Sequence, residues 1–222
     1  MKKVSLFFSI ILVLVFAIFI MNRKEMDKAK EDQALINDIK IEQNEGNLDE
    51  ISKIIVFSEP IEKASERVTK KNFGIYVTPK NSPVQPEKFQ GYHTGVDFEI
   101  FPGEEESDVF VKVICTGRLL SKRFASGYGG VATQECQLED APVVVVYGHL
   151  NLESIKHDSG DRLNAGDDLA ILGKGYSAQT DGERKHLHLA IHKGNAINIL
   201  GYVKNREQLS SWIDPCQYFC EK

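Results

Sequence analysis

The sequence has no excess of positive charge and few cysteines, and each of these shortages argues against one kind of binding site. The chain carries 27 lysine and arginine residues against 32 aspartate and glutamate residues, a formal net charge of −5. Nucleic-acid binding depends on clustered lysine and arginine, so we expect no nucleic-acid partner. There are only four cysteines and no CxxC pair, which argues against a cysteine-based metal site.

The chain has a single long hydrophobic run, at residues 4–21, which follows Lys2 and Lys3. As a helix this run would span about 27 Å, close to the roughly 30 Å hydrocarbon core of a membrane. The end of the run and the residues after it read FAIFIMNRKE, without the pair of small side chains that a signal-peptide cleavage site prefers. We therefore expect an uncleaved signal anchor, a transmembrane helix at residues 1–21, with a cleaved signal peptide as the alternative.

The rest of the chain divides into a polar part and a β-like part. Residues 22–52 are rich in charge, which predicts a solvated juxtamembrane spacer. Residues 53–222 contain short runs typical of strands, separated by glycine-rich turns, and long amphipathic helical patterns are absent after residue 70. The runs lie at residues 54–57, 108–115, 143–150, 168–173 and 186–192. The predicted fold is mainly β, an antiparallel sheet or sandwich behind an N-terminal transmembrane helix.

The four cysteines form two neighbouring pairs along the chain. Cys115 and Cys136 flank a predicted hairpin, and Cys216 and Cys220 lie close enough in sequence to pair. An even number of cysteines fits an exported domain stabilised by disulfides. Free buried thiols are the alternative, and the sequence does not decide between the two.

A split set of histidines and an aspartate is the main functional signal. His93 and Asp97 lie in HTGVD, four residues apart, and can reach one ion through a strand and turn or through one helical turn. Two imidazoles, one carboxylate and an open fourth position are what a hydrolytic zinc site needs. Iron oxygenases use the same ligand types, so ligand chemistry alone does not identify the metal.

The segment HLH at residues 186–188 supplies two further imidazoles. Side chains alternate along a strand, so His186 and His188 point to one face while Leu187 points into the core. His149 ends an apolar run in YGH, which puts an imidazole at the end of a strand. The two remaining histidines have other interpretations: His157 lies in a polar loop without a predicted role, and His192 is expected to have a structural or outer-shell role.

In this order, HTGVD, YGH and HLH resemble the signature of the M23 family of zinc metallopeptidases, the lysostaphin- and LytM-type peptidoglycan endopeptidases. SGYGG, RLNAGDDLAILGKG and SWIDP are also similar to stretches of that family, so the resemblance covers about residues 70 to 215. It implies that His93, Asp97 and His188 bind one Zn²⁺ per domain. It also implies that His149 and His186 act beside the metal-bound water, as general base and transition-state stabilisers.

The sequence departs from the family pattern at two points. FGIYVTP at residues 73–79 stands where many members have FG followed closely by arginine, and QECQLEDAP at residues 134–142 lengthens a hairpin. The loop at residues 77–92 leads into the first ligand and is a candidate cover for the site. Substrate contacts and latency are therefore open questions at the level of sequence.

These observations predict a zinc-dependent endopeptidase that hydrolyses peptide bonds in bacterial peptidoglycan crosslinks or stems. The N-terminal helix would make it a single-pass protein of the cell membrane with an extracytoplasmic peptidase domain. One alternative is a non-catalytic member that binds the cell wall or activates a hydrolase. Another is a zinc peptidase that acts on a protein substrate. Protein partners, oligomeric state and the bond that is cut do not follow from the sequence.

Overall fold

The structure, a computed structural model, describes residues 57–220. The expected transmembrane helix at residues 1–21, the spacer at 22–52 and most of the run at 54–57 lie outside these residues. Phe57, the last residue of that run, is in no strand. Within the described part of the chain, no helix is long and apolar enough to cross a membrane.

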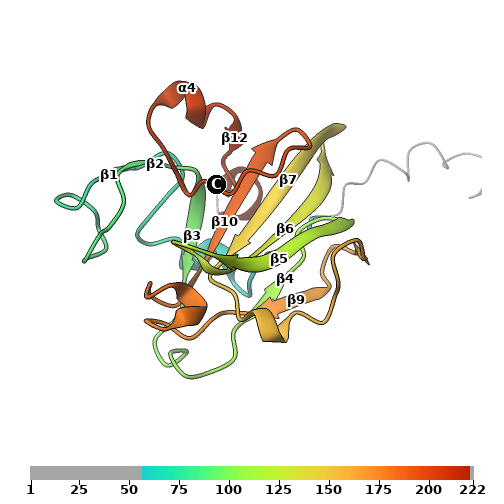
Figure 1. Cartoon of the computed structure of the whole chain (residues 1–222), viewed down its shortest axis with the longest axis horizontal. Coiled ribbons are helices and arrows are strands. Elements are labelled where there is room, and N and C mark those ends of the chain that lie inside the picture. The colour runs from blue at the N-terminus through green and yellow to red at the C-terminus, as the bar shows by residue number, and fades with distance from the viewer. Residues whose placement is uncertain (1–56, 221–222) are drawn as a thin grey trace, which may run out of the picture. The chain divides into compact units, whose positions relative to one another are not determined.

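The described residues form short antiparallel strands and a few single-turn helices (Figure 1). The strands are β1 (Tyr76–Val77), β2 (Gly91–His93), β3 (Gly95–Glu99), β4 (Phe110–Lys112), β5 (Gly117–Ala125), β6 (Gly129–Leu138), β7 (Ala141–Gly148), β8 (Arg162–Leu163), β9 (Asp168–Ile171), β10 (His186–Lys193), β11 (Tyr202–Val203) and β12 (Trp212–Ile213). The α-helices are α3 (Ala64–Arg67), α4 (Arg206–Leu209) and α5 (Cys216–Phe219), and 3₁₀ turns span Leu152–Ser154 and Ala178–Thr180. The prediction of a mainly β domain is confirmed.

One twisted sheet dominates the domain, with strand order β12-β10-β7-β6-β5-β8. Strand β3 pairs with the first half of β10, beside the place where β12 pairs with its end. All registered pairs in this sheet are antiparallel, as predicted. The pairing of β3 with β10 matters most for function, because it joins HTGVD to HLH across about ninety residues of sequence.

A small second layer, the antiparallel pair β4 and β9, packs against one face of the main sheet. The alternation in the run at 108–115 predicts one buried face, and Val109, Val111 and Val113 are indeed buried together in the core. The strand itself is shorter than the run, because β4 covers only Phe110–Lys112. The side chains of Phe98, Tyr147 and their neighbours fill the space between the two layers.

The two faces of β10 differ in composition. Leu187, Leu189 and Ile191 point into the core between the layers, and each is at most 1% exposed. His186 and His188 point to the opposite face, as the two-residue period of a strand requires. The prediction that HLH presents two imidazoles to one side is therefore confirmed.

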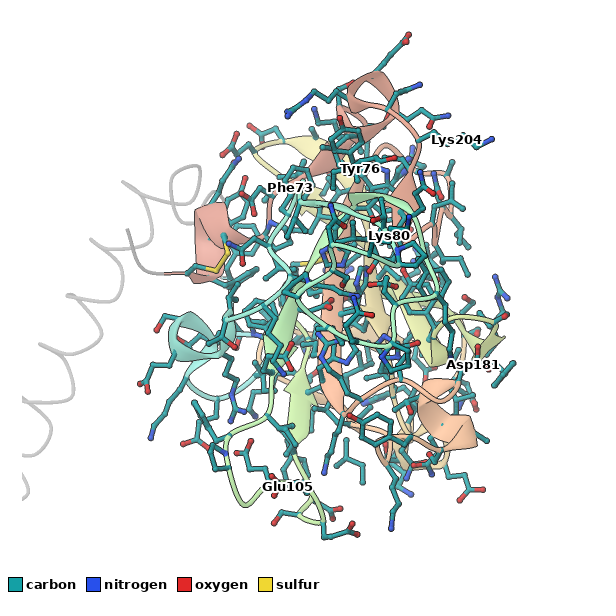
Figure 2. The ribbon with its side chains drawn as sticks, turned by 90° about the vertical axis from the view of Figure 1, so that its left-hand side faces the viewer. Phe73, Tyr76, Lys80, Glu105, Asp181 and Lys204 are labelled. Atoms are coloured by element: carbon teal, nitrogen blue, oxygen red, sulfur yellow. A yellow bond between two sulfur atoms is a disulfide. The ribbon has the colours of Figure 1, made fainter. Side chains whose placement is uncertain are left out.

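Both cysteine pairs form disulfides. The disulfide Cys115–Cys136 links the segment just before β5 to strand β6, with a Cα–Cα distance of 6.1 Å. The disulfide Cys216–Cys220 closes the single turn of α5. The predicted hairpin extension at 134–142 is also present, as β6 and β7 continue to a tight turn at Glu139 and Asp140. Charged side chains such as Glu105 and Lys204 are exposed and point away from the ribbon (Figure 2).

Candidate metal centre and active site

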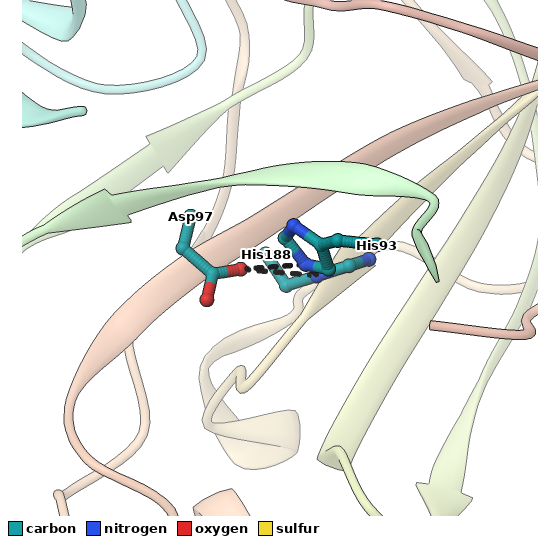
Figure 3. A group of neighbouring side chains, drawn as sticks. All are labelled: His93, Asp97 and His188. Carbon is teal, nitrogen blue, oxygen red and sulfur yellow. Dashed lines mark hydrogen bonds and ion pairs between the residues drawn. The ribbon is translucent and has the colours of Figure 1, made fainter. Parts of the chain in front are cut away.

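Three strands bring His93, Asp97 and His188 together in the interior (Figure 3). His93 ends β2, Asp97 is the centre of β3, and His188 is paired directly with Asp97 in β10. His93 Nε2 lies 3.0 Å from His188 Nδ1 and 3.2 Å from Asp97 Oδ1, and His188 Nδ1 lies 3.1 Å from the same Oδ1. Of the two routes open to HxxxD, the structure uses the extended one, with no helical turn.

These three atoms fit the ligand set of a tetrahedral metal site. Ligands bound to zinc at about 2.0–2.1 Å lie about 3.3 Å from one another, close to the distances of this triangle. His93 Nδ1 lies 3.2 Å from the backbone oxygen of Asn72. An Nδ1–H that donates to this carbonyl leaves the Nε2 lone pair free for a metal. All three residues are at most 3% exposed, so an ion here would be shielded from bulk solvent except through the cleft.

The glycine of HTGVD has a steric role at this site. A Cβ on Gly95 would collide with the backbone oxygen of Leu189 and would lie 2.9 Å from His188 Nε2. A side chain at this position would push β3 away from β10 and displace a metal ligand. The close approach of these strands therefore requires glycine.

His149 and His186 lie beside the ligand triangle. His149 follows the last residue of β7 in a left-handed conformation with φ of 63°, and its ring centroid is 4.2 Å from that of His186. His149 Nδ1 is buried and has no hydrogen-bond partner among the described residues. His186 Nδ1–H donates to the backbone oxygen of Arg184 over 2.9 Å, which holds the ring in one orientation.

Burial determines the charge of two of these imidazoles. Desolvation, followed by repulsion from His186, holds the pKa of His149 well below its usual value. Burial likewise lowers the pKa of His188 to about 4, against the opposing effect of Asp97. Both rings are therefore neutral at neutral pH, so each has a lone pair available for a proton or a metal.

Asp97 is an ionised carboxylate inside the protein. Burial by itself would raise its pKa, but the charges of His186, His93 and Arg184 hold that pKa well below its usual range. Arg184 Nη2 donates to Asp97 Oδ2 over 2.8 Å, and the same guanidinium is bonded to Glu99. The sequence interpretation included neither Arg184 nor Glu99. The sequence spacing could have indicated both residues. Glu99 lies two residues after Asp97 and Arg184 lies two residues before His186, the spacing that places side chains on one face of a strand.

The site opens into a cleft of about 430 Å³. Its walls carry aromatic and aliphatic side chains together with the five predicted site residues. The lining side chains outside the predicted set include Lys71, Phe89, Tyr128, Glu183, Arg184, Ile199, Leu200 and Tyr202. The Tyr128 hydroxyl is buried without a hydrogen-bond partner in the described structure, and its ring centroid is 5.2 Å from that of His188. A volume of this size lies within the range of about 300–1,000 Å³ typical of ligand-binding pockets.

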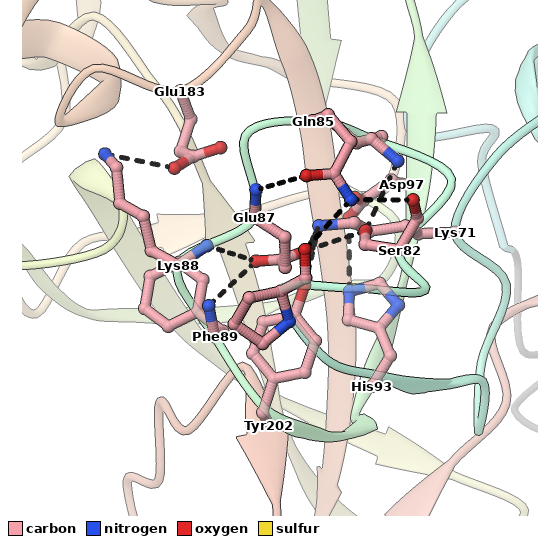
Figure 4. A network of polar contacts seen from close by, with 12 residues as sticks. Lys71, Ser82, Gln85, Glu87, Lys88, Phe89, His93, Asp97, Glu183 and Tyr202 are labelled. Carbon is pink, nitrogen blue, oxygen red and sulfur yellow. Dashed lines mark hydrogen bonds and ion pairs between the residues drawn. The ribbon is translucent and has the colours of Figure 1, made fainter.

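The predicted loop at 77–92 forms one wall of this cleft and is held by a buried ion pair (Figure 4). Lys71 Nζ lies 2.6 Å from Glu87 Oε2 and donates to the Tyr202 hydroxyl over 2.9 Å. Ser82 Oγ also donates to Glu87 Oε2, over 2.8 Å. The loop is anchored beside His93, and its residues Phe89 and Gln90 line the cleft.

The remaining histidines lie apart from the triangle. His192 shares a face with His188, but its ring contacts Trp212 edge-on at 4.8 Å between centroids, which agrees with the structural one of its two expected roles. His157 lies in the loop before β8 and does not line the cleft. The five predicted site residues therefore line one cleft, and His157 and His192 do not line it.

Comparison with known proteins agrees with this geometry. Residues 91–199 match the family model described as Peptidase family M23. The catalytic domain of the antimicrobial peptidase lysostaphin from Staphylococcus simulans is similar in structure, with 18% identity, coverage of 73% of this chain and 98% of that domain, and a TM-score of 0.50. At that identity the likeness concerns the fold.

Two further solved structures are similar at lower scores. LytU is 21% identical over 68% of this chain and 83% of its own, with a TM-score of 0.46. The protein cbpa from L. salivarius REN is 19% identical over 74% and 94%, with a TM-score of 0.45. A comparison with curated protein sequences found no match. The family match spans His93, Asp97, His149, His186 and His188, and on this evidence residues 91–199 belong to peptidase family M23.

Proposed function

We propose that this protein is a zinc-dependent endopeptidase that hydrolyses peptide bonds in the crosslinks or stems of bacterial peptidoglycan. One observation carries most of the weight. The ligand atoms of His93, Asp97 and His188 form a triangle with edges of 3.0–3.2 Å at an open cleft, beside the unpartnered Nδ1 of His149. That arrangement combines a metal site with a free proton acceptor.

The donor set fits zinc with one position left open. When bound by two imidazoles and one carboxylate, zinc lowers the pKa of a coordinated water to about 7 and polarises a carbonyl group. His93, Asp97 and His188 would hold the ion. The buried carboxylate of Asp97 would offset part of its charge, and the neutral ring of His188 would offer Nδ1.

His149 and His186 would handle protons and charge at the scissile bond. His149 is neutral because burial lowers its pKa, so Nδ1 can accept a proton from the attacking water as general base. The ring of His186 is held by the Arg184 carbonyl with Nε2 facing the site, 3.3 Å from Asp97 Oδ2. When protonated, His186 can donate to the oxyanion that develops on the substrate.

The proposed substrate and location rest on several kinds of support. The family match indicates a peptidase, and the structurally similar lysostaphin domain is the catalytic domain of an antimicrobial peptidase. Two disulfides in the domain are typical of proteins outside the reducing cytoplasm. Together with the apolar run at residues 4–21, they favour a single-pass membrane protein whose peptidase domain faces the cell wall.

Mass spectrometry of purified peptidoglycan after incubation with the zinc-loaded full chain tests this proposal. The matched control is His149→Ala, which removes the proposed base and leaves the three ligands in place. We expect new soluble peptide fragments from the unmutated chain alone, and their masses would identify the bond that is cut. No fragments from a folded, zinc-loaded chain would refute the peptidoglycan assignment and favour a protein-directed peptidase or a non-catalytic wall binder.

A further inference from the structure

We infer that Arg184 is a positioning residue for the metal ligand Asp97, and that Glu99 in turn fixes Arg184. The inference rests on the proposed metal site and adds to it two residues outside the HxxxD and HxH motifs. It assigns the two oxygens of Asp97 different tasks, one toward the metal and one toward the protein.

The two carboxylate oxygens of Asp97 contact different groups. Oδ1 faces the two ligand nitrogens, His93 Nε2 at 3.2 Å and His188 Nδ1 at 3.1 Å. Oδ2 faces away from them, accepts from Arg184 Nη2 over 2.8 Å and lies 3.3 Å from His186 Nε2. A carboxylate whose second oxygen is already bonded to a guanidinium binds a metal through one oxygen. That mode keeps the fourth position of the ion free.

Glu99 holds Arg184 through the geometry of the guanidinium. Arg184 Nε donates to Glu99 Oε2 over 2.9 Å, and Nη2 donates to Oε1 of the same carboxylate. Such paired bonds fix the plane and direction of an arginine as a single ion pair does not. The backbone oxygen of Glu99 accepts from the buried Arg67, which ties this end of β3 to the preceding helix.

Strand register explains why these side chains meet. Asp97 and Glu99 lie two residues apart in β3, on one face, and pair with His188 and His186 of β10. Arg184 lies two residues before His186, so the same spacing continues just outside the strand. One guanidinium therefore reaches both carboxylates of β3.

The charges give this arrangement its effect. Asp97 and Glu99 are both buried, and Arg184 lies between them with 8% of its side chain exposed. Arginine keeps its charge at any physiological pH, so Asp97 Oδ2 always has a donor. Without it, two carboxylates would be buried side by side, and Asp97 would be free to turn and present both oxygens to the ion.

The test measures metal binding by the purified full chain in mild detergent, with Zn²⁺ titrated against a chromogenic chelator. Replacing a group that orients a metal ligand typically weakens metal affinity about 10–100-fold, and we expect Arg184→Gln to fall in this range. Arg184→Lys keeps the charge but not the paired bonds, so it should recover only part of the affinity. Lys174→Gln is the control, since this exposed lysine pairs with Glu106 at the surface.

The visible spectrum of the Co²⁺-loaded chain separates positioning from general stability. Four-coordinate Co²⁺ absorbs more strongly than five-coordinate Co²⁺, so a carboxylate that turns to bind through both oxygens weakens the band. We expect that weakening in Arg184→Gln and not in Lys174→Gln. Glu99→Gln keeps the side-chain volume but weakens the hold on Arg184, so its Co²⁺ band should weaken in the same direction by a smaller amount. This variant also provides the test if Arg184→Gln does not fold.

The outcomes separate this inference from the proposal beneath it. Failure of the unmutated chain to bind Zn²⁺ or Co²⁺ would refute the metal site itself. Normal binding by the unmutated chain, with affinity and spectrum unchanged in both Arg184→Gln and Glu99→Gln, would overturn only the role of Arg184.

Discussion

The two faces of β10 are equally buried yet carry different tasks. On one face Leu187 and Leu189 are 0% exposed, and on the other His186 and His188 are 2% and 3% exposed. Burial alone therefore does not distinguish core from site in this strand. The difference lies in the partners: the leucines contact other apolar side chains, whereas the histidines meet groups from β2, β3 and the end of β7 at defined atoms.

This contrast suggests different tolerance to change on the two faces. Apolar contacts are non-directional, so a side chain of similar volume can replace another at modest cost. A metal ligand must offer one atom at one place, and no substitution by volume restores it. Substitutions on opposite faces of the same strand can separate the two effects.

The largest expected effect is that of His188→Ala on the site face. Replacing a residue that only orients a ligand weakens metal affinity by at most about 100-fold. Loss of a direct ligand should weaken Zn²⁺ binding further, and cleavage of peptidoglycan should be lost with it. The fold should persist, because the variant loses only the contacts of His188 Nδ1 with Asp97 and His93, while the apolar face of β10 stays packed in the core. Zinc content per purified molecule and circular dichroism measure the two halves of this prediction. A variant with full zinc content would remove His188 from the ligand set.

On the core face, Leu189→Ala should instead destabilise the fold. Leu189 is completely buried, and such truncations cost about 2–5 kcal/mol through lost burial and the cavity that remains. Zinc bound per folded molecule should not change, since the ligands stay in place. Urea denaturation of the metal-free chain gives the free energy of unfolding. Leu189→Met, with a cost below about 1.5 kcal/mol, is the volume control, and an equal loss in both variants would contradict the argument.

A smaller effect is expected from Glu87→Gln in the loop at 77–92. Burial alone would raise the pKa of Glu87, but bonds from Lys71, the Phe89 amide and Ser82 lower it below its ordinary 4.5. A depressed pKa stabilises the fold above pH 4.5, and this stability is lost as the pH falls through the folded value. At pH 7 the variant should therefore be less stable by about 1–3 kcal/mol.

The difference between Glu87→Gln and the unmutated chain should shrink as the pH falls from 5 toward 3, because the native carboxylate then becomes protonated as well. Urea denaturation midpoints across this range, with Glu153→Gln at an exposed position as the control, measure it. A constant difference at all pH values would mean that the charge of Glu87 does not contribute to anchoring the loop.

Much of the β10 contrast was predictable from local pattern. The two-residue period separates the leucines from the histidines of HLHLAIH, and the same period predicts the buried valines before Cys115. The limits of the strands were less predictable, as β4 is shorter than its alternating run. Strand length depends on which backbone groups find partners in β9, and the sequence of β4 does not contain that information.

The residues that the sequence interpretation missed share one property. Lys71, Glu87, Glu99 and Arg184 are charged, and the usual expectation for charged side chains is exposure. Each is buried here because a partner of opposite charge comes from another segment, such as Lys71 with Glu87 and Arg184 with Glu99. Sequence spacing hints at Arg184 and Glu99, but it does not indicate that their strands are neighbours.

Local sequence pattern was enough to predict the type of domain and its available chemistry: short alternating strands, and an ordered set of imidazoles and one carboxylate suited to a metal. The three-dimensional packing was needed to show which of those atoms meet. It also shows that one oxygen of Asp97 faces the other ligands and the second faces Arg184, and that the loop at 77–92 is held beside His93. The two kinds of information differ in the sequence separation of the residues that carry them. Side-chain alternation is a property of neighbouring residues, whereas the register between β3 and β10 depends on the packing of segments about ninety residues apart.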